Sequence, residues 1–351
     1  MKKQLVALGF TLLSISLPLK ASAATFSKIF VFGDSLSDPG NVFNATKALG
    51  DSNKVLPPSP PYFGGRFSNG LVWAEYFGKE LGLFPTPVTA LGNQPAKDGI
   101  NFAFGGATTG KNNAIAPDLP TGVLTQVNLF TVPLEKINQK ADPEALYAIW
   151  AGGNDYLFGN NVDPTVPIAN LTNAVKSLSD VGAKNILIFN QPDLGQLPST
   201  RIDPAISAGL STLTALHNSA LSAAVEGFQQ SGLNIIPVDV DSLVKEIKAD
   251  PEKFGFKDAT NSCLVGDFKA IAEGTATLCN NPDDFAFFDA VHPSTKVHNL
   301  IAQAALSKVK YSTTSVPEPS VAIGILTLGA IGVTTLKRKN QKLRQEVAVR
   351  N

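Results

Sequence analysis

The sequence is poor in residues that bind metals or carry redox chemistry. Its 351 residues include only two cysteines, three histidines and one methionine. No C-x-x-C, H-E-x-x-H or EF-hand pattern occurs in it, which argues against the common zinc and calcium sites. The phosphate-binding G-x-x-x-x-G-K-[ST] loop and the G-x-G-x-x-G fingerprint of dinucleotide-binding proteins are missing as well. The sequence therefore carries none of these common metal-, phosphate- or dinucleotide-binding motifs.

An excess of positive charge is also missing. Lys and Arg together number 29, and so do Asp and Glu. The basic residues gather toward the two ends, so that residues 24–315 hold 20 basic and 27 acidic side chains. An acidic body does not suit binding to the nucleic-acid backbone, and we expect no nucleic-acid partner. With 44% hydrophobic residues, the composition is typical of a globular protein, and residues 24–315 fit one large domain.

Residues 1–23 have the three parts of a secretory signal peptide. Lys2 and Lys3 provide a positive start, residues 5–19 are apolar, and Ala21-Ser22-Ala23 matches an A-x-A cleavage site. The alternative is a buried first helix, which does not account for this order. The pattern predicts export from the cell, to the envelope, the surface or the medium.

Residues 316–351 look like a second targeting signal. Pro317-Glu318-Pro319 precedes an uncharged apolar run, residues 320–336, which is at the short limit for a membrane span. A basic cluster, residues 337–339, follows and should stay cytoplasmic. This tail resembles the PEP-CTERM sorting signal. The resemblance implies transient membrane attachment and removal by an exosortase-type processing enzyme, whereas a plain permanent anchor is the alternative.

The two cysteines both lie in the predicted exported body. Cys263 and Cys279 form an even pair, and an oxidising compartment favours a disulfide between them. Two separate thiols are the alternative. Two cysteines without nearby histidine do not make a metal site.

Short apolar runs alternate with amphipathic segments along the body. The runs predicted as buried strands are residues 28–33, 99–103, 145–151, 186–190 and 233–240. The helical patterns cover residues 69–81, 123–137, 168–181, 203–230 and 295–308. This alternation predicts an α/β fold in which a parallel sheet has helices on both faces, with the chemistry at the carboxyl ends of the strands.

The first predicted strand ends in Gly33-Asp34-Ser35-Leu36. A serine just past a strand can present its hydroxyl at the carboxyl edge of the sheet, although Gly-Asp-Ser is also ordinary turn chemistry. The G-x-S-x-G elbow of α/β-hydrolases does not occur in the chain, which disfavours that class.

A nucleophilic serine needs a base, and the chain offers three histidines. His292 has Asp289 three residues ahead of it, where a carboxylate can orient the imidazole and stabilise its protonated form. A helix-entry turn with an accidental Asp explains this pair equally well. His217 lies inside a helical pattern and is predicted to be structural, and His298 lies in the last helical pattern and is predicted to be a packed or surface residue.

Donors for an oxyanion are available in two glycine-containing segments. Gly105-Gly106 follows one predicted strand, and Gly152-Gly153-Asn154-Asp155 follows another. Glycine lets a backbone N–H approach a ligand closely, and the Asn154 amide supplies a side-chain donor. A tight turn and a helix N-cap are the alternatives.

Together these blocks resemble the GDSL, or SGNH, hydrolase family. The segment Tyr62–Gly70 also looks like one that these proteins carry after the first block. The resemblance implies a flavodoxin-like three-layer sandwich with a five-stranded parallel sheet and no cofactor. It also implies three catalytic roles: Ser35 as nucleophile, His292 as base and Asp289 as its orienter. The implied oxyanion donors are the N–H groups of Ser35 and Gly106 and the amide of Asn154, where Gly106 is the second glycine of its pair.

The sequence therefore predicts an exported serine esterase or lipase acting on a small ester or a lipid. Transfer of the acyl group to another alcohol, or deacetylation of a polysaccharide, would use the same chemistry. The alternative from another functional class is a surface or biofilm-matrix protein whose hydrolase site is not used.

Overall fold

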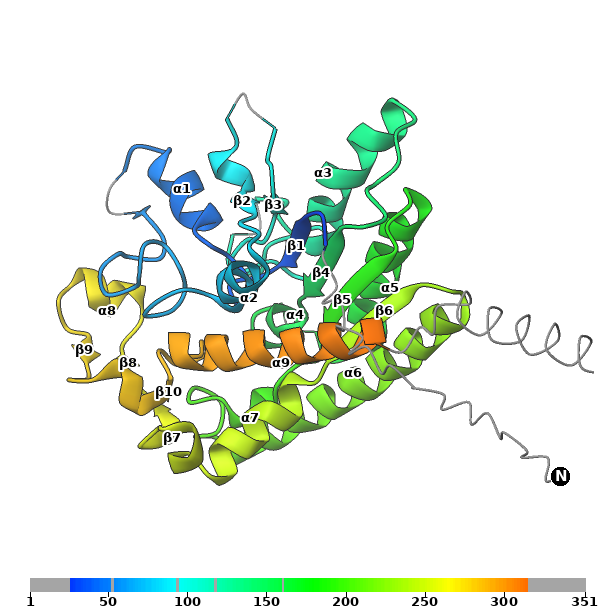
Figure 1. Ribbon diagram of the computed structural model, residues 1–351. Coiled ribbons are helices and arrows are strands. Elements are labelled where there is room, and N and C mark those ends of the chain that lie inside the picture. The colour runs from blue at the N-terminus through cyan, green and yellow to red at the C-terminus, as the bar shows by residue number, and fades with distance from the viewer. Residues whose placement is uncertain (1–25, 52–53, 93–94, 117–118, 160, 315–351) are drawn as a thin grey trace, which may run out of the picture. The chain divides into compact units, whose positions relative to one another are not determined.

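A parallel sheet forms the centre of the structure (Figure 1). Its strand order is β2-β3-β1-β4-β5-β6, and all neighbours are parallel. The strands are β1 (Ile29–Gly33), β2 (Thr86–Pro87), β3 (Gly99–Asn101), β4 (Leu146–Trp150), β5 (Asn185–Phe189) and β6 (Asn234–Val238). Five of them match the predicted strands. The expected number of five is corrected to six because β2, an edge strand of two residues, is too short to leave a hydrophobic pattern.

This computed structural model describes residues 26–51, 54–92, 95–116, 119–159 and 161–314. The predicted signal peptide and sorting tail lie outside the described residues. Residues 25–312 form one compact unit. None of the helices in the described ranges combines the length and the apolar character that a membrane span requires.

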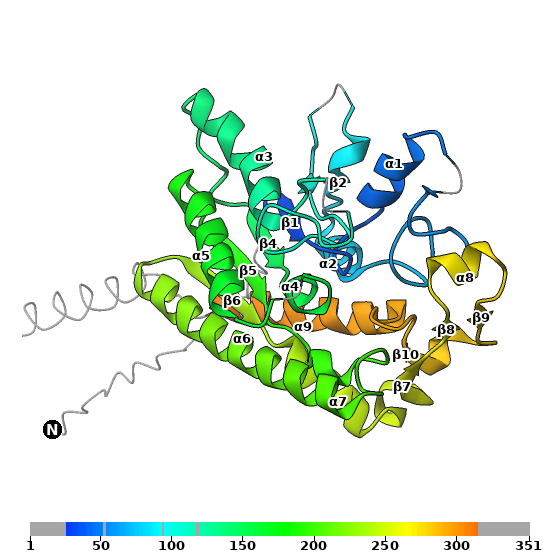
Figure 2. The same ribbon diagram turned by 180° about the vertical axis from the view of Figure 1, so that it is seen from behind.

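Helices cover both faces of the sheet, as predicted. The helices are α1 (Asn41–Lys47), α2 (Trp73–Leu81), α3 (Val123–Lys136), α4 (Gly153–Leu157), α5 (Thr165–Asp180), α6 (Pro204–Gln230), α7 (Val240–Ala249), α8 (Phe268–Ala272) and α9 (Thr295–Thr314). Figure 1 shows α9 in front of the sheet, and Figure 2 shows α3, α5 and α6 over the opposite face. The three-layer α/β sandwich is confirmed.

The strands are apolar on both faces because each face packs against helices. On one face, Phe32 and Ile149 belong to a core that includes Val127 of α3 and Leu171 of α5. On the other, Trp73 of α2 packs its ring 4.4 Å from that of Phe189. Burial on both sides explains why the strands appear as uninterrupted apolar runs in the sequence.

Several predicted boundaries shift in the structure. Helix α2 begins at Trp73, four residues later than predicted, and α9 continues six residues further, to Thr314. The run predicted as a strand to residue 240 ends at Val238, and α7 begins at Val240. The cause is the Asp239 carboxylate, which accepts the Ser242 N–H and so caps a helix that the apolar pattern did not indicate.

A small region between α7 and α9 was not predicted. Here β7 (Asp258–Ser262) pairs with β10 (Phe285–Phe287), and β8 (Leu264–Val265) pairs with β9 (Thr277–Leu278). Cys263 and Cys279 form a disulfide that closes the loop carrying α8. The region matters for the site because the chain leaves β10 directly into Asp289 and His292.

Candidate active site

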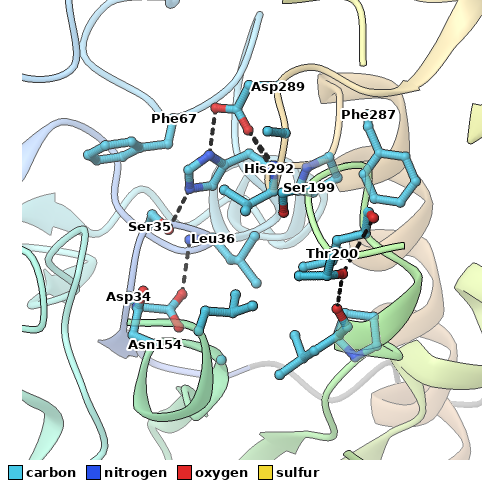
Figure 3. Close-up of a pocket in the computed structure, with 18 of the residues that line it drawn as sticks. Asp34, Ser35, Leu36, Phe67, Asn154, Ser199, Thr200, Phe287, Asp289 and His292 are labelled. Atoms are coloured by element: carbon cyan, nitrogen blue, oxygen red, sulfur yellow. Dashed lines mark hydrogen bonds and ion pairs between the residues drawn. The ribbon is translucent and has the colours of Figure 1, made fainter. Parts of the chain in front are cut away.

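The predicted site residues come together at the carboxyl edge of the sheet (Figure 3). Ser35 follows β1, Gly106 lies beyond β3, and Asn154 lies in the first turn of α4, just after β4. Asp289 and His292 arrive from β10. Parallel strands point their carboxyl ends to one edge, so residues that are up to 257 positions apart in sequence meet there.

Ser35, His292 and Asp289 form a continuous chain of hydrogen bonds. His292 Nε2 lies 2.8 Å from Ser35 Oγ, and His292 Nδ1 lies 2.7 Å from Asp289 Oδ2 (Figure 3). The other carboxylate oxygen, Asp289 Oδ1, accepts the N–H groups of Val291 and His292 at 2.9 and 2.7 Å. With Nδ1–H donating to Asp289, the lone pair of Nε2 faces the serine hydroxyl, which is the arrangement that deprotonates a serine.

The Asp289 carboxylate stays ionised although it is buried. Burial opposes its charge, but His292 and the donated hydrogen bonds outweigh that effect and hold the pKa of Asp289 below its ordinary value. An ionised Asp289 can stabilise the imidazolium that forms when His292 takes a proton.

The two glycines Gly105 and Gly106 differ in what their N–H groups do. The Gly105 N–H donates to Asp38 Oδ2 at 2.9 Å, whereas Gly106 lines the cavity beside Ser35. Neither the Gly106 N–H nor the Ser35 N–H has an acceptor among the residues that the structure describes. Gly106 adopts φ +79°, and a Cβ there would collide with the side chain of Asn113. The geometry therefore favours Gly106 over Gly105 as a donor.

Asn154 contributes one amide hydrogen to structure and leaves the other for the cavity that it lines. Its Nδ2 donates to the Ala107 carbonyl at 3.0 Å. The next residue, Asp155, accepts the N–H and the hydroxyl of Thr109 at 2.9 and 2.7 Å. These bonds join α4 to the loop after β3, so the Asn154 amide and the Gly106 N–H are held in fixed positions relative to each other.

Two further carboxylates shape the loops. Asp34 accepts the Leu36 N–H at 3.0 Å, and burial raises the pKa of Asp34 to about 7. Asp38 accepts the N–H groups of Gly40 and Gly105 at 2.8 and 2.9 Å, and so connects the start of α1 to the glycine pair. The anchoring role of Asp38 was missed because it depends on a contact 67 residues away.

Tyr62 is a neighbour of the site that the sequence did not single out for a role. Its hydroxyl donates to Asp289 Oδ2 at 2.6 Å, the same oxygen that receives His292 Nδ1. The ring of Phe67 packs 5.3 Å from the imidazole of His292. Ser68 Oγ donates to the Pro293 carbonyl at 2.9 Å. The segment Tyr62–Gly70 therefore holds the loop that carries the histidine.

The remaining histidines lie away from the cavity wall, in agreement with their predicted roles outside catalysis. His217 is buried in α6 with Nδ1 2.9 Å from the Tyr156 hydroxyl, and burial lowers its pKa to about 4. His298 is buried in α9, where Nδ1 accepts the Trp73 N–H, and burial lowers its pKa to about 3. Within the described ranges, no group of three His, Cys, Asp or Glu side chains is arranged to hold a metal ion.

A cavity of about 850 Å³ opens beside the Ser35 hydroxyl. Its wall includes all five predicted site residues, namely Ser35, Gly106, Asn154, Asp289 and His292. The rest of the wall is mainly aliphatic and aromatic. Ser35 itself is only 8% exposed. A largely apolar pocket with a few converging polar groups is typical of a small-molecule site.

A parallel α/β sandwich with a Ser-His-Asp chain and unpaired N–H donors at its carboxyl edge defines the class of serine acylhydrolases. The comparisons with known proteins agree. Residues 29–305 match the model of the GDSL-like lipase/acylhydrolase family, and the chain belongs to that family.

Two curated relatives illustrate the family. A phosphatidylcholine-sterol acyltransferase of Aeromonas hydrophila is 30% identical over 88% of this chain and 98% of the relative. Esterase EstA of Pseudomonas aeruginosa is also 30% identical, over 90% of this chain, which spans about half of that longer protein (52%). The relatives support an ester hydrolase or acyltransferase type of activity.

The solved structures that match this chain are more distant in sequence. A member of the lipolytic G-D-S-L family from Veillonella parvula is 15% identical, with a TM-score of 0.42 over 80% of this chain and 96% of that structure.

Proposed function

We propose that this chain is an exported serine ester hydrolase, an esterase or lipase that cleaves carboxylic esters through an acyl-enzyme on Ser35. The hydrogen-bonded chain from Ser35 Oγ through His292 to Asp289 is the observation that carries this proposal. The family supports acylhydrolase chemistry in general, and the site geometry supports these particular residues.

Acylation uses the geometry directly. Ser35 Oγ bonds to the ester carbonyl carbon while its proton passes to His292 Nε2, 2.8 Å away. The carbonyl oxygen becomes an oxyanion, for which the N–H groups of Ser35 and Gly106 and the free amide hydrogen of Asn154 serve as donors. The carbon–oxygen bond to the alcohol then breaks, and the alcohol leaves with the proton from His292.

Deacylation repeats these steps with water. His292 Nε2 takes a proton from a water molecule as the water oxygen bonds to the acyl carbon. The bond to Ser35 Oγ breaks, Ser35 recovers the proton, and the carboxylic acid leaves. Asp289 remains ionised throughout and balances the positive charge on His292.

Replacing Ser35 tests the proposal. Ser35→Ala should fold normally and lose ester hydrolysis by several orders of magnitude, as loss of a triad serine does elsewhere. A serine-reactive phosphonate should label the wild type but not this variant. The matched control is Ser231→Ala, an exposed serine at the end of α6, which should keep wild-type turnover. If Ser35→Ala kept wild-type turnover, the assignment of the nucleophile would be wrong.

Acyl transfer is a second candidate, favoured by the relative from Aeromonas hydrophila that is named as an acyltransferase. The acyl-enzyme would then pass its acyl group to an alcohol in place of water. Incubation with an ester and an added long-chain alcohol separates the two activities, because only transfer yields a new ester.

We also propose that the protein is exported from a bacterial cell. The Cys263–Cys279 disulfide supports this, since disulfides persist in oxidising compartments. Transient membrane attachment and cleavage by an exosortase-type enzyme rest on residues 316–351, which lie outside the described residues.

A further inference from the structure

The cavity continues away from Ser35 along the carboxyl edge of the sheet. Its wall takes in Trp150 at the end of β4, Gln191 just after β5 and Val240 just after β6. Because the strand order is β1-β4-β5-β6, the wall crosses three strand spacings. At about 4.8 Å for each spacing, this distance is roughly 14 Å.

Beyond β6 the wall is formed by one face of α7. Val244, Ile247 and Lys248 all line the cavity, and their spacing of three and four residues places them on the same side of the helix. Phe287 of β10 and Ile301 of α9 line the cavity as well. In Figure 3, Phe287 and Thr200 lie on the opposite side of the cavity from Ser35 and Phe67. We call the part lined by Val244, Ile247, Lys248, Phe287 and Ile301 the distal chamber.

Two polar side chains near the distal chamber, those of Thr200 and Lys248, are bonded within the protein. Thr200 Oγ1 donates to the Leu194 carbonyl at 2.5 Å. Lys248 Nζ donates to the Gln196 carbonyl at 3.0 Å, which links α7 to the 3₁₀ turn Leu194–Gln196 and leaves the methylene stem of Lys248 to line the wall. Since the other side chains that define the chamber are apolar, a sugar or other polar group would lose most of its hydrogen bonds to water here without replacement. An apolar chain would not.

The order of the chemical steps indicates which half of an ester fits there. After Ser35 attacks, the alcohol departs with a proton and makes room for water, whereas the acyl group stays bonded to Ser35 Oγ until water releases it. A largely apolar chamber that extends from the nucleophile suits the half that stays.

We propose that the distal chamber binds the acyl chain, so that the substrates are esters of medium- or long-chain acids. This rests on the proposed function of Ser35. An extended chain of roughly ten carbons covers the distance from the β1 end to α7. The added methylenes should each raise kcat/KM by about two- to fourfold until the chamber is filled.

Narrowing the chamber tests this proposal. The full chain is assayed with p-nitrophenyl esters from acetate to hexadecanoate. We expect the wild type to prefer decanoate over acetate, and Val244→Trp to lower the decanoate-to-acetate ratio of kcat/KM by about tenfold or more. The matched control is Val162→Trp. Val162 is 79% exposed and lies outside the cavity wall, so its replacement should leave the ratio unchanged.

A second variant works in the opposite direction. Val244→Ala enlarges the chamber and should move the preferred ester to a longer acyl chain. Thermal melting shows whether each variant is folded. If Val244→Trp does not fold, the ester preference of Val244→Ala decides whether the chamber binds the acyl chain. A series with a constant acetyl group and lengthening alcohols shows which half of the ester Val244 senses.

The results separate the chamber from the catalytic proposal. A wild type that prefers acetate, or a folded Val244→Trp with the wild-type ratio, would overturn the chamber. The chamber would also be overturned if Val244→Ala preferred the same acyl-chain length as the wild type. The same holds if the Val244 variants changed only the rates with the series of lengthening alcohols. A wild type that hydrolyses no ester at all would instead contradict the proposed catalytic function.

Discussion

At the residue scale, the two amide hydrogens of Asn154 have different roles, one structural and one proposed to be catalytic. One hydrogen binds the Ala107 carbonyl, and the other is free to meet charge that develops on a carbonyl oxygen. Asn154→Ala should therefore lower kcat by about 10²- to 10³-fold with little change in KM, because this donor acts mainly in the transition state. Steady-state kinetics with one ester measure both constants.

Asn185→Ala is the matched control for this prediction. Asn185 also donates from Nδ2 to a carbonyl, that of Pro143, but at the start of β5, the opposite edge of the sheet. Its replacement should leave kcat unchanged. A rise in KM at constant kcat in Asn154→Ala would show instead that the amide binds the ground state.

Tyr62 offers a test of how Asp289 is held. Tyr62→Phe removes the hydroxyl that donates to Asp289 Oδ2 and helps to keep the pKa of Asp289 low. We expect kcat to fall by roughly tenfold, the size of one lost hydrogen bond to a charged group. Without this donor the Asp289 carboxylate is held less firmly toward His292, and the pKa of Asp289 should rise toward its ordinary value.

Steady-state kinetics of Tyr62→Phe and the wild type with one ester measure the change in kcat. Tyr147→Phe is the control, since its hydroxyl donates to the Asp142 carbonyl in the core, away from the cavity. Equal kcat values in Tyr62→Phe and the wild type would show that the bond does not contribute to catalysis.

Residue-level prediction from sequence depended on local spacing. Asp289 and His292 are three residues apart, so their pairing was visible before any fold was known. Tyr62 lies 227 residues from its partner Asp289, and no local pattern connects them. The same holds for Asp38 and Gly105, whose bond explains why Gly106 is the available donor.

At the element scale, helix α6 supports the turn that carries Asn154. His217 packs against Gly152, and a side chain at Gly152 would press on the imidazole. Burial lowers the pKa of His217 to about 4, from an ordinary value of 6.5. Between these two values the unfolded chain binds a proton that the folded protein does not, so stability falls as pH falls through this window.

His217→Gln should remove this pH dependence while an amide still reaches the Tyr156 hydroxyl. The free energy of unfolding of the wild type should lose about 3 kcal/mol more than that of the variant between pH 7.5 and pH 4. Urea unfolding at several pH values measures both. Because His298 is present in both proteins, its contribution cancels. Parallel pH curves for the two proteins would contradict the burial of a neutral His217.

Whether an element was predictable depended on its length and burial. The strands β1, β4 and β5 are buried on both faces and gave clear apolar runs. The five-residue helices α4 and α8 are too short for a periodic pattern, and β8 and β9 have two residues each. Helix α7 was not predicted from the sequence because its first apolar residues continue the apolar run of β6. This helix forms part of the wall of the cavity.

At the scale of the whole molecule, the proposed export concerns both the distribution of charge and the disulfide. The body from residue 24 to 315 is acidic, while Lys and Arg outnumber Asp and Glu in both terminal segments. The disulfide Cys263–Cys279 closes a loop whose Phe268 lines the cavity beside Tyr62. The oxidising environment that export provides would therefore also preserve one wall of the proposed active site.

Intact mass spectrometry of mature protein from the native host tests export and sorting together. The chain should begin near Ala24 and end near Pro319, because the apolar run 320–336 can enter a bilayer while Lys337, Arg338 and Lys339 stay inside. Without reductant, the mass should be lower by two hydrogen atoms for the disulfide. Ser35→Ala should be processed like the wild type, since the proposed cleavage does not depend on catalysis. Deleting the host's exosortase should leave a longer, membrane-bound form. If mature protein at the surface kept its complete tail, the tail would be a permanent anchor and not a sorting signal.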